Sequence, residues 1–166
     1  MRNLRSLMLL LACLFQVALA HAQDFGWFSQ VVGACWKGTF PDGTTSHRHC
    51  YSRQFETFIR GTSELHALRE GKQLTVFQGD SLFAWNASSG TIQYYVWGTD
   101  GNHRQLSAQY EKDELHFPVP SRQDPSKMAF RSVWRRLNES SFEVRRERPS
   151  GDGWSVDLRV VYRREV

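Results

Sequence analysis

Apolar and polar residues alternate along most of the chain after residue 31. The alternation is cleanest near the C-terminus, where Trp154, Val156, Leu158, Val160 and Tyr162 are separated by polar residues. A period of two is typical of a strand that is buried on one face. We therefore predict that these five side chains lie together on the buried face of one strand.

Nine further runs have the same character, and no segment has the periodicity of a long helix. Residues 25–30 are compatible with a single helical turn. The other predicted strands are Val32 to Phe40, Thr44 to Arg53, Thr57 to His66, Gln73 to Trp85, Thr91 to Trp97, Arg104 to Tyr110, Glu114 to Phe117, Met128 to Leu137 and Ser141 to Arg148. The pattern predicts an all-β domain of about ten strands.

Short turn sequences such as Pro41-Asp42-Gly43 and Asp100-Gly101-Asn102 separate these runs. They have the length of hairpin connections. An antiparallel sheet of this size must close or stack to protect its edges, as a barrel or a sandwich. Hairpin connections throughout favour a single antiparallel up-and-down barrel. The one long connection, Pro118 to Lys127, is expected to be a loop over one rim.

The N-terminus predicts export. Arg2 and Arg5 precede an apolar run from Leu7 to Leu19, and small residues follow. This is the pattern of a secretory signal peptide, and the run is shorter than the about 20 residues that a membrane span needs. We predict a signal peptide over residues 1–22, with cleavage after Ala20 as an alternative, and a β-barrel domain over 23–166. The mature protein would be periplasmic or secreted. A lipoprotein with acylated Cys13 is the less favoured alternative.

Charge argues against a nucleic-acid partner. Without the two leader arginines, 19 Lys and Arg stand against 17 Asp and Glu. The arginines crowd the C-terminal third but are interleaved with acidic residues, so they make no coherent positive field. We expect a solvated strand face with cross-strand ion pairs, and no membrane association after signal cleavage.

The segment Val32-Gly33-Ala34-Cys35-Trp36-Lys37-Gly38 resembles the first strand of lipocalin-like (calycin) β-barrels. Residues 82–90 and 94–101 are similar to segments of uncharacterised secreted bacterial proteins of that barrel type. In the signature of the family, however, the glycine stands two residues before the tryptophan, whereas Gly33 stands three before Trp36.

The resemblance implies a barrel in which Trp36 closes the base against a basic residue of the last strand, Arg159 or Arg163. It implies ligand binding at the level of the fold and nothing more specific. The C-terminal region lacks a histidine matching the haem ligand of nitrobindin-like barrels, so no haem is implied. We expect no cofactor.

Cys35 and Cys50 are predicted to form a disulfide, because paired cysteines in an exported protein are usually oxidised. A two-residue turn at Asp42-Gly43 would place the two cysteines directly opposite each other. A type I turn at Pro41-Asp42 with Gly43 as a bulge would instead point them to opposite faces. Pro41 cannot donate the closing hydrogen bond of the two-residue form, which favours the second register.

Histidines are the only candidates for a metal site. His47 and His49 share one face of the second strand, and His-x-His can chelate a metal when Glu64 or His66 supplies a third ligand. No spacing fixes that ligand, and an outward polar face is the more usual role of such a pair. No nucleophile and base or paired carboxylates mark a catalytic site, so we predict no catalytic residues.

Aromatic residues dominate the apolar content, with six Trp, five Tyr and eleven Phe. They predict either a cavity for a small hydrophobic or amphipathic ligand or a filled barrel. Candidate ligand-binding residues are Arg60, Trp85, Tyr95, Trp97, Arg131 and Trp134, with an arginine for an acidic head group. We predict a non-catalytic binding barrel. The alternatives are a protein-binding module, such as an inhibitor of an exported enzyme, and, less favoured, a metal-dependent or hydrolytic enzyme.

Overall fold

The computed structural model describes residues 25–166 as one 3-10 helix followed by ten strands. The predicted signal peptide lies outside the described residues. The elements are η1 (Gly26–Val31), β1 (Ala34–Thr39), β2 (Thr45–Gln54), β3 (Phe58–Arg69), β4 (Lys72–Asn86), β5 (Thr91–Gly98), β6 (His103–Glu111), β7 (Glu114–Pro120), β8 (Met128–Asn138), β9 (Ser141–Ser150) and β10 (Gly153–Arg164).

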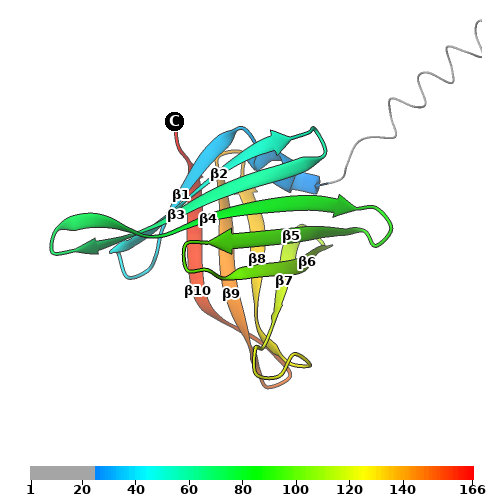
Figure 1. Cartoon of the computed structure of the whole chain (residues 1–166). Coiled ribbons are helices and arrows are strands. Elements are labelled where there is room, and N and C mark those ends of the chain that lie inside the picture. Colours follow the sequence, from blue (N-terminus) through cyan, green and yellow to red (C-terminus); the bar gives the residue numbers. More distant parts are fainter. Residues whose placement is uncertain (1–24) are drawn as a thin grey trace, which may run out of the picture.

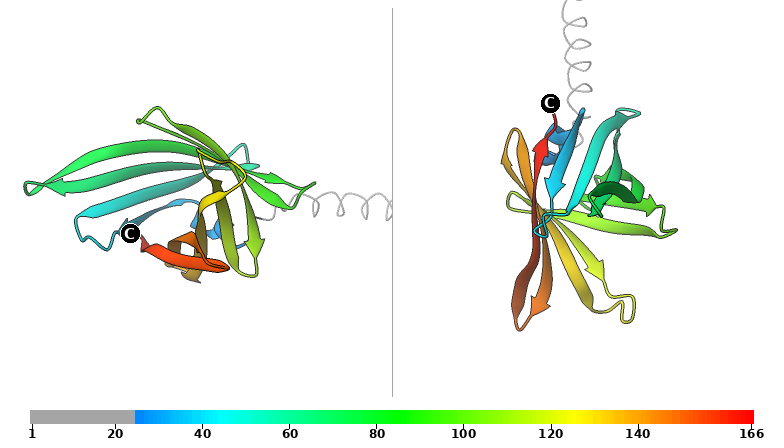
Figure 2. Two further views of the ribbon diagram at one scale, coloured as in Figure 1. Left: turned by 90° about the horizontal axis from the view of Figure 1, so that it is seen from below. Right: turned by 90° about the vertical axis from the view of Figure 1, so that its left-hand side faces the viewer.

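The ten strands form a closed antiparallel barrel in which neighbours in sequence are neighbours in space, and β10 returns to pair with β1. This confirms the predicted all-β fold and its up-and-down order. Strands β3, β4 and β5 cross β8, β9 and β10 at a steep angle (Figure 1), so the barrel is flattened into two walls. The β3–β4 hairpin extends well beyond the barrel body, as the left panel of Figure 2 shows.

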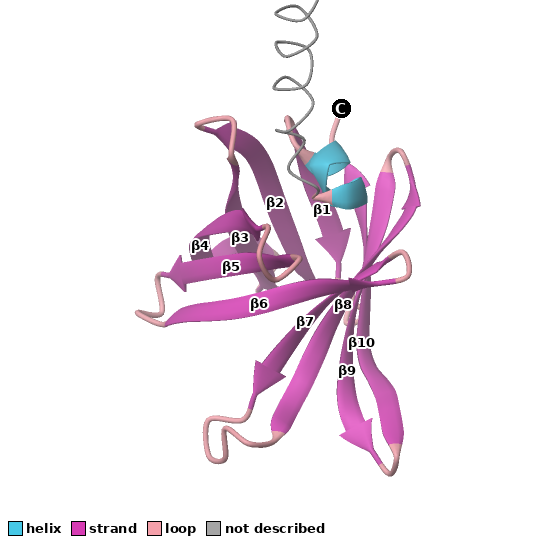
Figure 3. Ribbon diagram, turned by 90° about the vertical axis from the view of Figure 1, so that its right-hand side faces the viewer, coloured by secondary structure: helices cyan, strands magenta, loops and turns pink. Residues whose placement is uncertain are grey.

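Helix η1 covers one end of the barrel (Figure 3). Phe25 and Phe28 from this segment are fully buried. The Phe28 ring packs 4.8 Å from Phe83 and 5.7 Å from Trp134, between centroids. The hydroxyl of Tyr110 donates to the carbonyl of Phe25 at 2.7 Å, which fixes the start of the segment to β6. The predicted helical turn is therefore an apolar plug that closes one end of the barrel.

Cys35 and Cys50 are paired directly across β1 and β2 and form the predicted disulfide. This is the register that was predicted for a two-residue turn at Asp42-Gly43, which Pro41 was expected to disfavour. The hairpin closes one pair earlier, where the amide of Phe40 donates to the carbonyl of Thr45, so Pro41 need not donate. Gly43 has a φ of +69° in this four-residue loop, a conformation that glycine adopts without strain.

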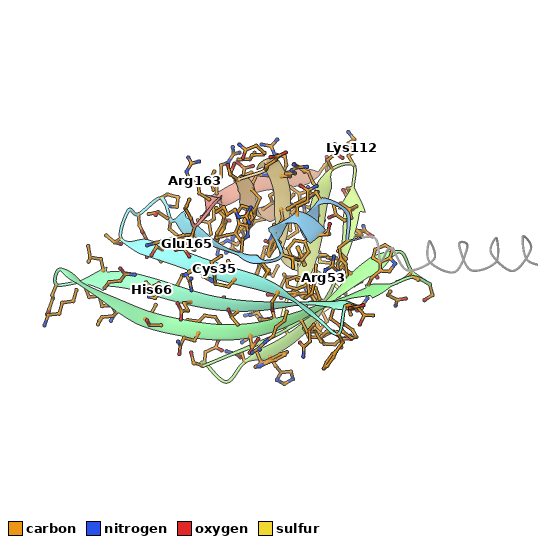
Figure 4. All side chains as sticks on the ribbon, turned by 90° about the horizontal axis from the view of Figure 1, so that it is seen from above. Cys35, Arg53, His66, Lys112, Arg163 and Glu165 are labelled. Carbon is orange, nitrogen blue, oxygen red and sulfur yellow. A yellow bond between two sulfur atoms is a disulfide. The ribbon has the colours of Figure 1, made fainter. Side chains whose placement is uncertain are left out.

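The C-terminal end runs beside this cross-linked hairpin, and Figure 4 shows Glu165 next to Cys35. The amide of Glu165 donates to the carbonyl of Cys35 at 2.8 Å. The guanidinium of Arg48 binds the Glu165 carboxylate at 2.6 Å. These contacts extend the β1–β10 seam, which has register pairs only from Trp36 to Gly38.

The prediction that five alternating apolar residues of β10 share one face is wrong. The register shifts between Val156 and Leu158, because Val156 pairs with Glu147 whereas Leu158 pairs with Arg146. Glu147 and Arg146 are adjacent and point to opposite faces, so the bulge turns Val156 outward with Trp154. Both side chains are exposed, at 46% and 39%.

The long connection after β7 is shorter than predicted. Residues 118–120, which were expected to begin a rim loop, continue β7 and pair with β8 up to Met128. Pro118 is tolerated there because proline can occupy a strand edge that makes no ladder hydrogen bond. Only residues 121–127 remain as a loop.

Candidate functional site

The barrel interior contains an apolar cavity of about 310 Å³ between β4, β5, β6, β7 and β8, which we call the inner cavity. Its wall is mostly aromatic and aliphatic. The lining residues are Phe77, Tyr94, Val96, Trp97, Gly98, Asp100, Asn102, Arg104, Leu106, Phe117, Val119, Phe130, Ser132 and Trp134. The barrel is therefore hollow on this side.

Packed rings define the floor of the inner cavity. Phe117 lies 4.9 Å from Trp134 and 5.5 Å from Tyr94, between ring centroids. Phe83 stacks on Tyr94 at 4.5 Å and carries the packing on toward the fully buried Phe28. The end covered by η1 is thus filled by packed rings, and the inner cavity lies toward the opposite end.

Two glycines make room for one wall of the inner cavity. A Cβ atom on Gly98 would lie 2.3 Å from the Phe77 ring, and one on Gly79 would lie 2.8 Å from it. Gly79 and Gly98 are register partners on β4 and β5. The Phe77 ring lies against both backbones because neither residue has a side chain, and this packing forms the wall near Trp97.

The barrel wall is open between β6 and β7. These strands pair only from Gln109 to Glu111, and Figure 3 shows them diverging beyond that point. A second cavity of about 420 Å³ lies at this gap, and it shares Arg104, Leu106, Val119 and Phe130 with the inner cavity. We call the gap the side opening, because it connects the inner cavity with solvent.

A hydrogen bond between two loops spans the far end of the side opening. The guanidinium of Arg122, in the β7–β8 loop, donates to the side-chain oxygen of Asn102, in the β5–β6 loop, at 3.2 Å. This exposed hydrogen bond joins the two walls beyond the point where their backbone pairing has ended. The side opening is therefore framed by paired strands at one end and by one solvent-exposed contact at the other.

Arg104 is the cation of this site. It pairs with Val96 in register and lines both cavities. The nearby Asp100 carboxylate accepts from the Asn102 amide at 2.7 Å, and no carboxylate of residues 25–166 forms a salt bridge with Arg104. Burial raises the pKa of Tyr94 to about 12, although a hydrogen bond with Ser81 and the charge of Arg104 oppose the rise. Tyr94 is therefore a neutral hydroxyl at physiological pH.

The predicted aromatic ligand residues are divided between the two faces. Trp134 lines the inner cavity, and Trp97 borders it from the outward-facing side of β5, where it is 49% exposed. Trp85 faces the interior beside the fully buried Ile92, in the packed end and away from the cavity. Tyr95 follows the cavity-lining Tyr94 on β5 and so points outward, which removes it from the candidate site.

Neither predicted anchoring arginine faces the cavity. Arg60 follows the fully buried Ile59 on β3, points outward and binds Asp80 through two hydrogen bonds of 2.9 and 2.6 Å. Arg131 precedes the cavity-lining Ser132 and also points outward, where it binds Glu147 at 2.7 Å. Strand parity places both residues outside the barrel, whereas Arg104 lines the cavity.

The predicted closure of the barrel base is also wrong. Trp36 is buried and pairs with Arg164, so Arg159 and Arg163 lie on the opposite face of β10. The Trp36 indole donates to the carbonyl of Val31 at 2.9 Å, and its ring packs 5.3 Å from Phe142. Arg159 binds Glu143 on the outer face.

The histidine pair points into the barrel, contrary to the outward face that such a pair usually adopts. The Nδ1 atom of His47 lies 3.0 Å from the Tyr162 hydroxyl and 3.2 Å from Nε2 of His49. Burial lowers the pKa of His47 to about 4 and lowers that of His49 well below its usual range. Both imidazoles are therefore neutral at physiological pH.

Neither predicted third metal ligand joins this pair. Glu64 is the register partner of Arg48, which lies between the two inward histidines and so faces outward. His66 bonds with the Thr75 hydroxyl and lies 3.6 Å from Glu64. Within residues 25–166, no group of three or more His, Cys, Asp or Glu residues has metal-binding geometry.

The outer face of β7 to β10 carries the expected cross-strand ion pairs, but they are less solvated than predicted. Arg145 binds Glu114, Glu143 and Glu147 at 2.9 to 3.2 Å, and only 12% of its side chain is exposed. The interleaved arginines and acids therefore neutralise one another across strands.

Comparison with known proteins identifies the fold and no family. No protein-family description matches the chain, and no curated protein matches it. The crystal structure of Rv2717c from M. tuberculosis is similar, with a TM-score of 0.50 and 13% identity over 84% of this chain and 95% of that one. At this identity the similarity shows a shared closed β-barrel fold alone. Among residues 25–166, no helix is long and apolar enough to span a bilayer.

Proposed function

We propose that this protein is a non-catalytic binding barrel for a small amphipathic molecule with an anionic head group. The observation that carries the proposal is the aromatic inner cavity with Arg104 at its mouth, where the guanidinium interacts electrostatically with Asp100 and forms no salt bridge with the carboxylates of residues 25–166. The disulfide fits an oxidising compartment. Together with the signal-peptide pattern, it supports action in the periplasm or outside the cell.

The inner cavity suits the apolar part of the ligand. Its volume of about 310 Å³ is at the lower end of the range for small-molecule sites. Burial of a methylene contributes about 0.8 kcal/mol. A chain of about ten carbons would thus gain about 8 kcal/mol before the cost of association, so the apolar part alone supports at most micromolar affinity.

Arg104 suits the head group. A guanidinium presents several N–H donors in a plane that matches a carboxylate, and hydrogen bonds to charged groups contribute about 1.5–3 kcal/mol. Arg104 is exposed, so the lower part of that range applies. It also lines the side opening, so a ligand that entered there would keep its charged end at the surface.

The proposal is tested by calorimetric titration with decanoate and with decanol, which share a chain length and differ in the head group. Wild-type protein should bind both and prefer decanoate. Arg104→Gln should weaken decanoate binding about tenfold and leave decanol binding unchanged, because only the anion uses the guanidinium.

A matched pair of variants locates the binding. Leu106→Trp places a large ring in the shared lining of the inner cavity and the side opening and should abolish binding of both probes. Ser107→Trp adds the same ring at the next, outward-facing position of β6 and should bind normally. Absence of saturable binding to wild-type protein, or normal binding to Leu106→Trp, would overturn the proposal.

A further inference from the structure

Three donor atoms converge inside the barrel on the side formed by β1, β2 and β10, away from the inner cavity. His47 and His49 are two residues apart on β2 and share its inward face. The Nδ1 atom of His47 is 3.2 Å from Nε2 of His49 and 3.0 Å from the hydroxyl oxygen of Tyr162 on β10. One nitrogen and one oxygen atom thus both lie within hydrogen-bond distance of His47 Nδ1.

The two separations from His47 Nδ1 are close to the distance between neighbouring donors in a tetrahedral metal site. Zinc binds histidine nitrogen at about 2.0–2.1 Å and carboxylate oxygen at about 2.0–2.2 Å, which separates neighbouring donors in a tetrahedron by about 3.3 Å. We propose that His47 Nδ1, His49 Nε2 and Tyr162 Oη bind one divalent ion of the zinc type. Water occupies the fourth position.

The protein holds each donor in place before any ion binds. The His49 ring is parallel to the ring of Tyr51, with centroids 5.8 Å apart. The Tyr162 ring stacks on Phe142 at 5.0 Å. Cys50, which follows His49, is cross-linked to β1. A site whose ligands are fixed by packing loses little conformational entropy on binding.

The metal site is separate from the inner cavity. None of the three donors lines the inner cavity. The rings of His49 and Trp134 are 6.3 Å apart, which places Trp134 between the metal site and the ligand site. The two sites therefore serve separate ligands, and either can be tested without the other.

The test is calorimetric titration of the disulfide-bonded, metal-free protein with Zn²⁺, followed by the visible spectrum of its Co²⁺ complex. We expect one Zn²⁺ per chain and the intense Co²⁺ bands of tetrahedral coordination. His47→Ala and His49→Ala should each weaken Zn²⁺ binding at least about tenfold, since even indirect supports of a metal site have effects of that size.

Two further variants distinguish ligation from packing. Tyr162→Phe keeps the ring on Phe142 and removes only the oxygen, so it should weaken Zn²⁺ binding less than loss of a histidine and shift the Co²⁺ bands. His103→Ala removes an exposed histidine elsewhere and should change neither. Circular dichroism and a thermal melt verify folding, and His49→Gln replaces His49→Ala should the latter unfold.

Other results overturn the proposal. No saturable Zn²⁺ binding to the wild-type chain would mean that the three atoms form only a neutral hydrogen-bonded group. Unchanged Zn²⁺ affinity in folded His47 and His49 variants would show that these histidines do not bind the ion. Loss of Zn²⁺ binding in His103→Ala would show that the ion binds at the outer surface and not at the proposed site.

Discussion

Arg145 provides the sharpest test of the outer ion-pair network. Its guanidinium donates to both oxygens of Glu114 at 2.9 Å, to Glu143 at 3.2 Å and to Glu147 at 3.0 Å. The side chains of Glu143 and Glu147 are only 5% and 7% exposed. Arg145→Met keeps much of the side-chain volume and removes the charge, leaving three carboxylates close together.

The expected loss of stability is about 3 kcal/mol near neutral pH. Removing one partner of a buried ion pair costs about 3–5 kcal/mol because the other charge stays buried. The lower end applies, since Arg131 still binds Glu147 and Arg135 still binds Glu143. For a domain of this size, such a loss lowers Tm by roughly 10 °C.

The loss should shrink in acid. Hydrogen bonds from Arg145 hold the pKa of Glu114 below its usual value. Burial alone would raise the pKa of Glu147, but hydrogen bonds from Arg131 and Arg145 lower it. A lowered folded-state pKa stabilises the protein above the unfolded-state value of about 4.3, and that stability is lost as the pH falls through the folded-state value. The wild type therefore loses its advantage below about pH 4.

The assay is urea unfolding followed by tryptophan fluorescence, near pH 7 and at acidic pH. Arg146→Met is the matched control, because Arg146 is the next residue of β9, more exposed, and bound to the single carboxylate of Asp157. It should cost less than about 1 kcal/mol. Equal losses in the two variants, or a loss in Arg145→Met that does not shrink in acid, would refute this reasoning.

Three other changes test the fold. Serine at both Cys35 and Cys50 should lower the unfolding free energy by about 3 kcal/mol in chemical denaturation, since the cross-link closes a loop of sequence separation 15; an unchanged midpoint would contradict this. Phe28→Ala should cost about 3–5 kcal/mol by emptying the plug of the barrel; a loss below 1 kcal/mol would show that η1 detaches readily. Gly38→Ala should lower Tm, because its Cβ would lie 2.5 Å from Val160; a melt like that of the wild type would mean that the β1–β10 seam relaxes.

Much of the fold could be predicted from the sequence because its signals are local. Alternation and turn residues located the ten strands to within a few residues. Hairpin-length connections predicted that strands consecutive in sequence pair with each other in the barrel. The disulfide was also predicted. Its register was not, since Pro41 was assumed to lie at the closing position of the turn, whereas the four-residue loop leaves it unpaired.

The faces of the candidate site residues were harder to predict, because one unrecognised bulge or one wrong parity reverses the face of every side chain that follows. The bulge near Asp157 has no sequence signal such as glycine, and it moved Trp154 and Val156 outside. Arg104 alternates with the cavity-lining Leu106 and so shares its inward face. It was overlooked because arginine is expected at the surface and nothing in the sequence shows that β6 and β7 separate.

Native mass spectrometry of the protein purified from its own host would show whether the inner cavity carries a small molecule, with Leu106→Trp and Ser107→Trp prepared in parallel. We expect an additional mass of a few hundred daltons, within the range of small-molecule ligands for such a cavity, on wild-type protein and Ser107→Trp. Leu106→Trp should carry no additional mass. After mild denaturation has released the bound molecule, refolded wild-type protein should bind decanoate. A wild-type protein that carries no ligand and takes up none, or a ligand retained by Leu106→Trp, would contradict the proposed binding.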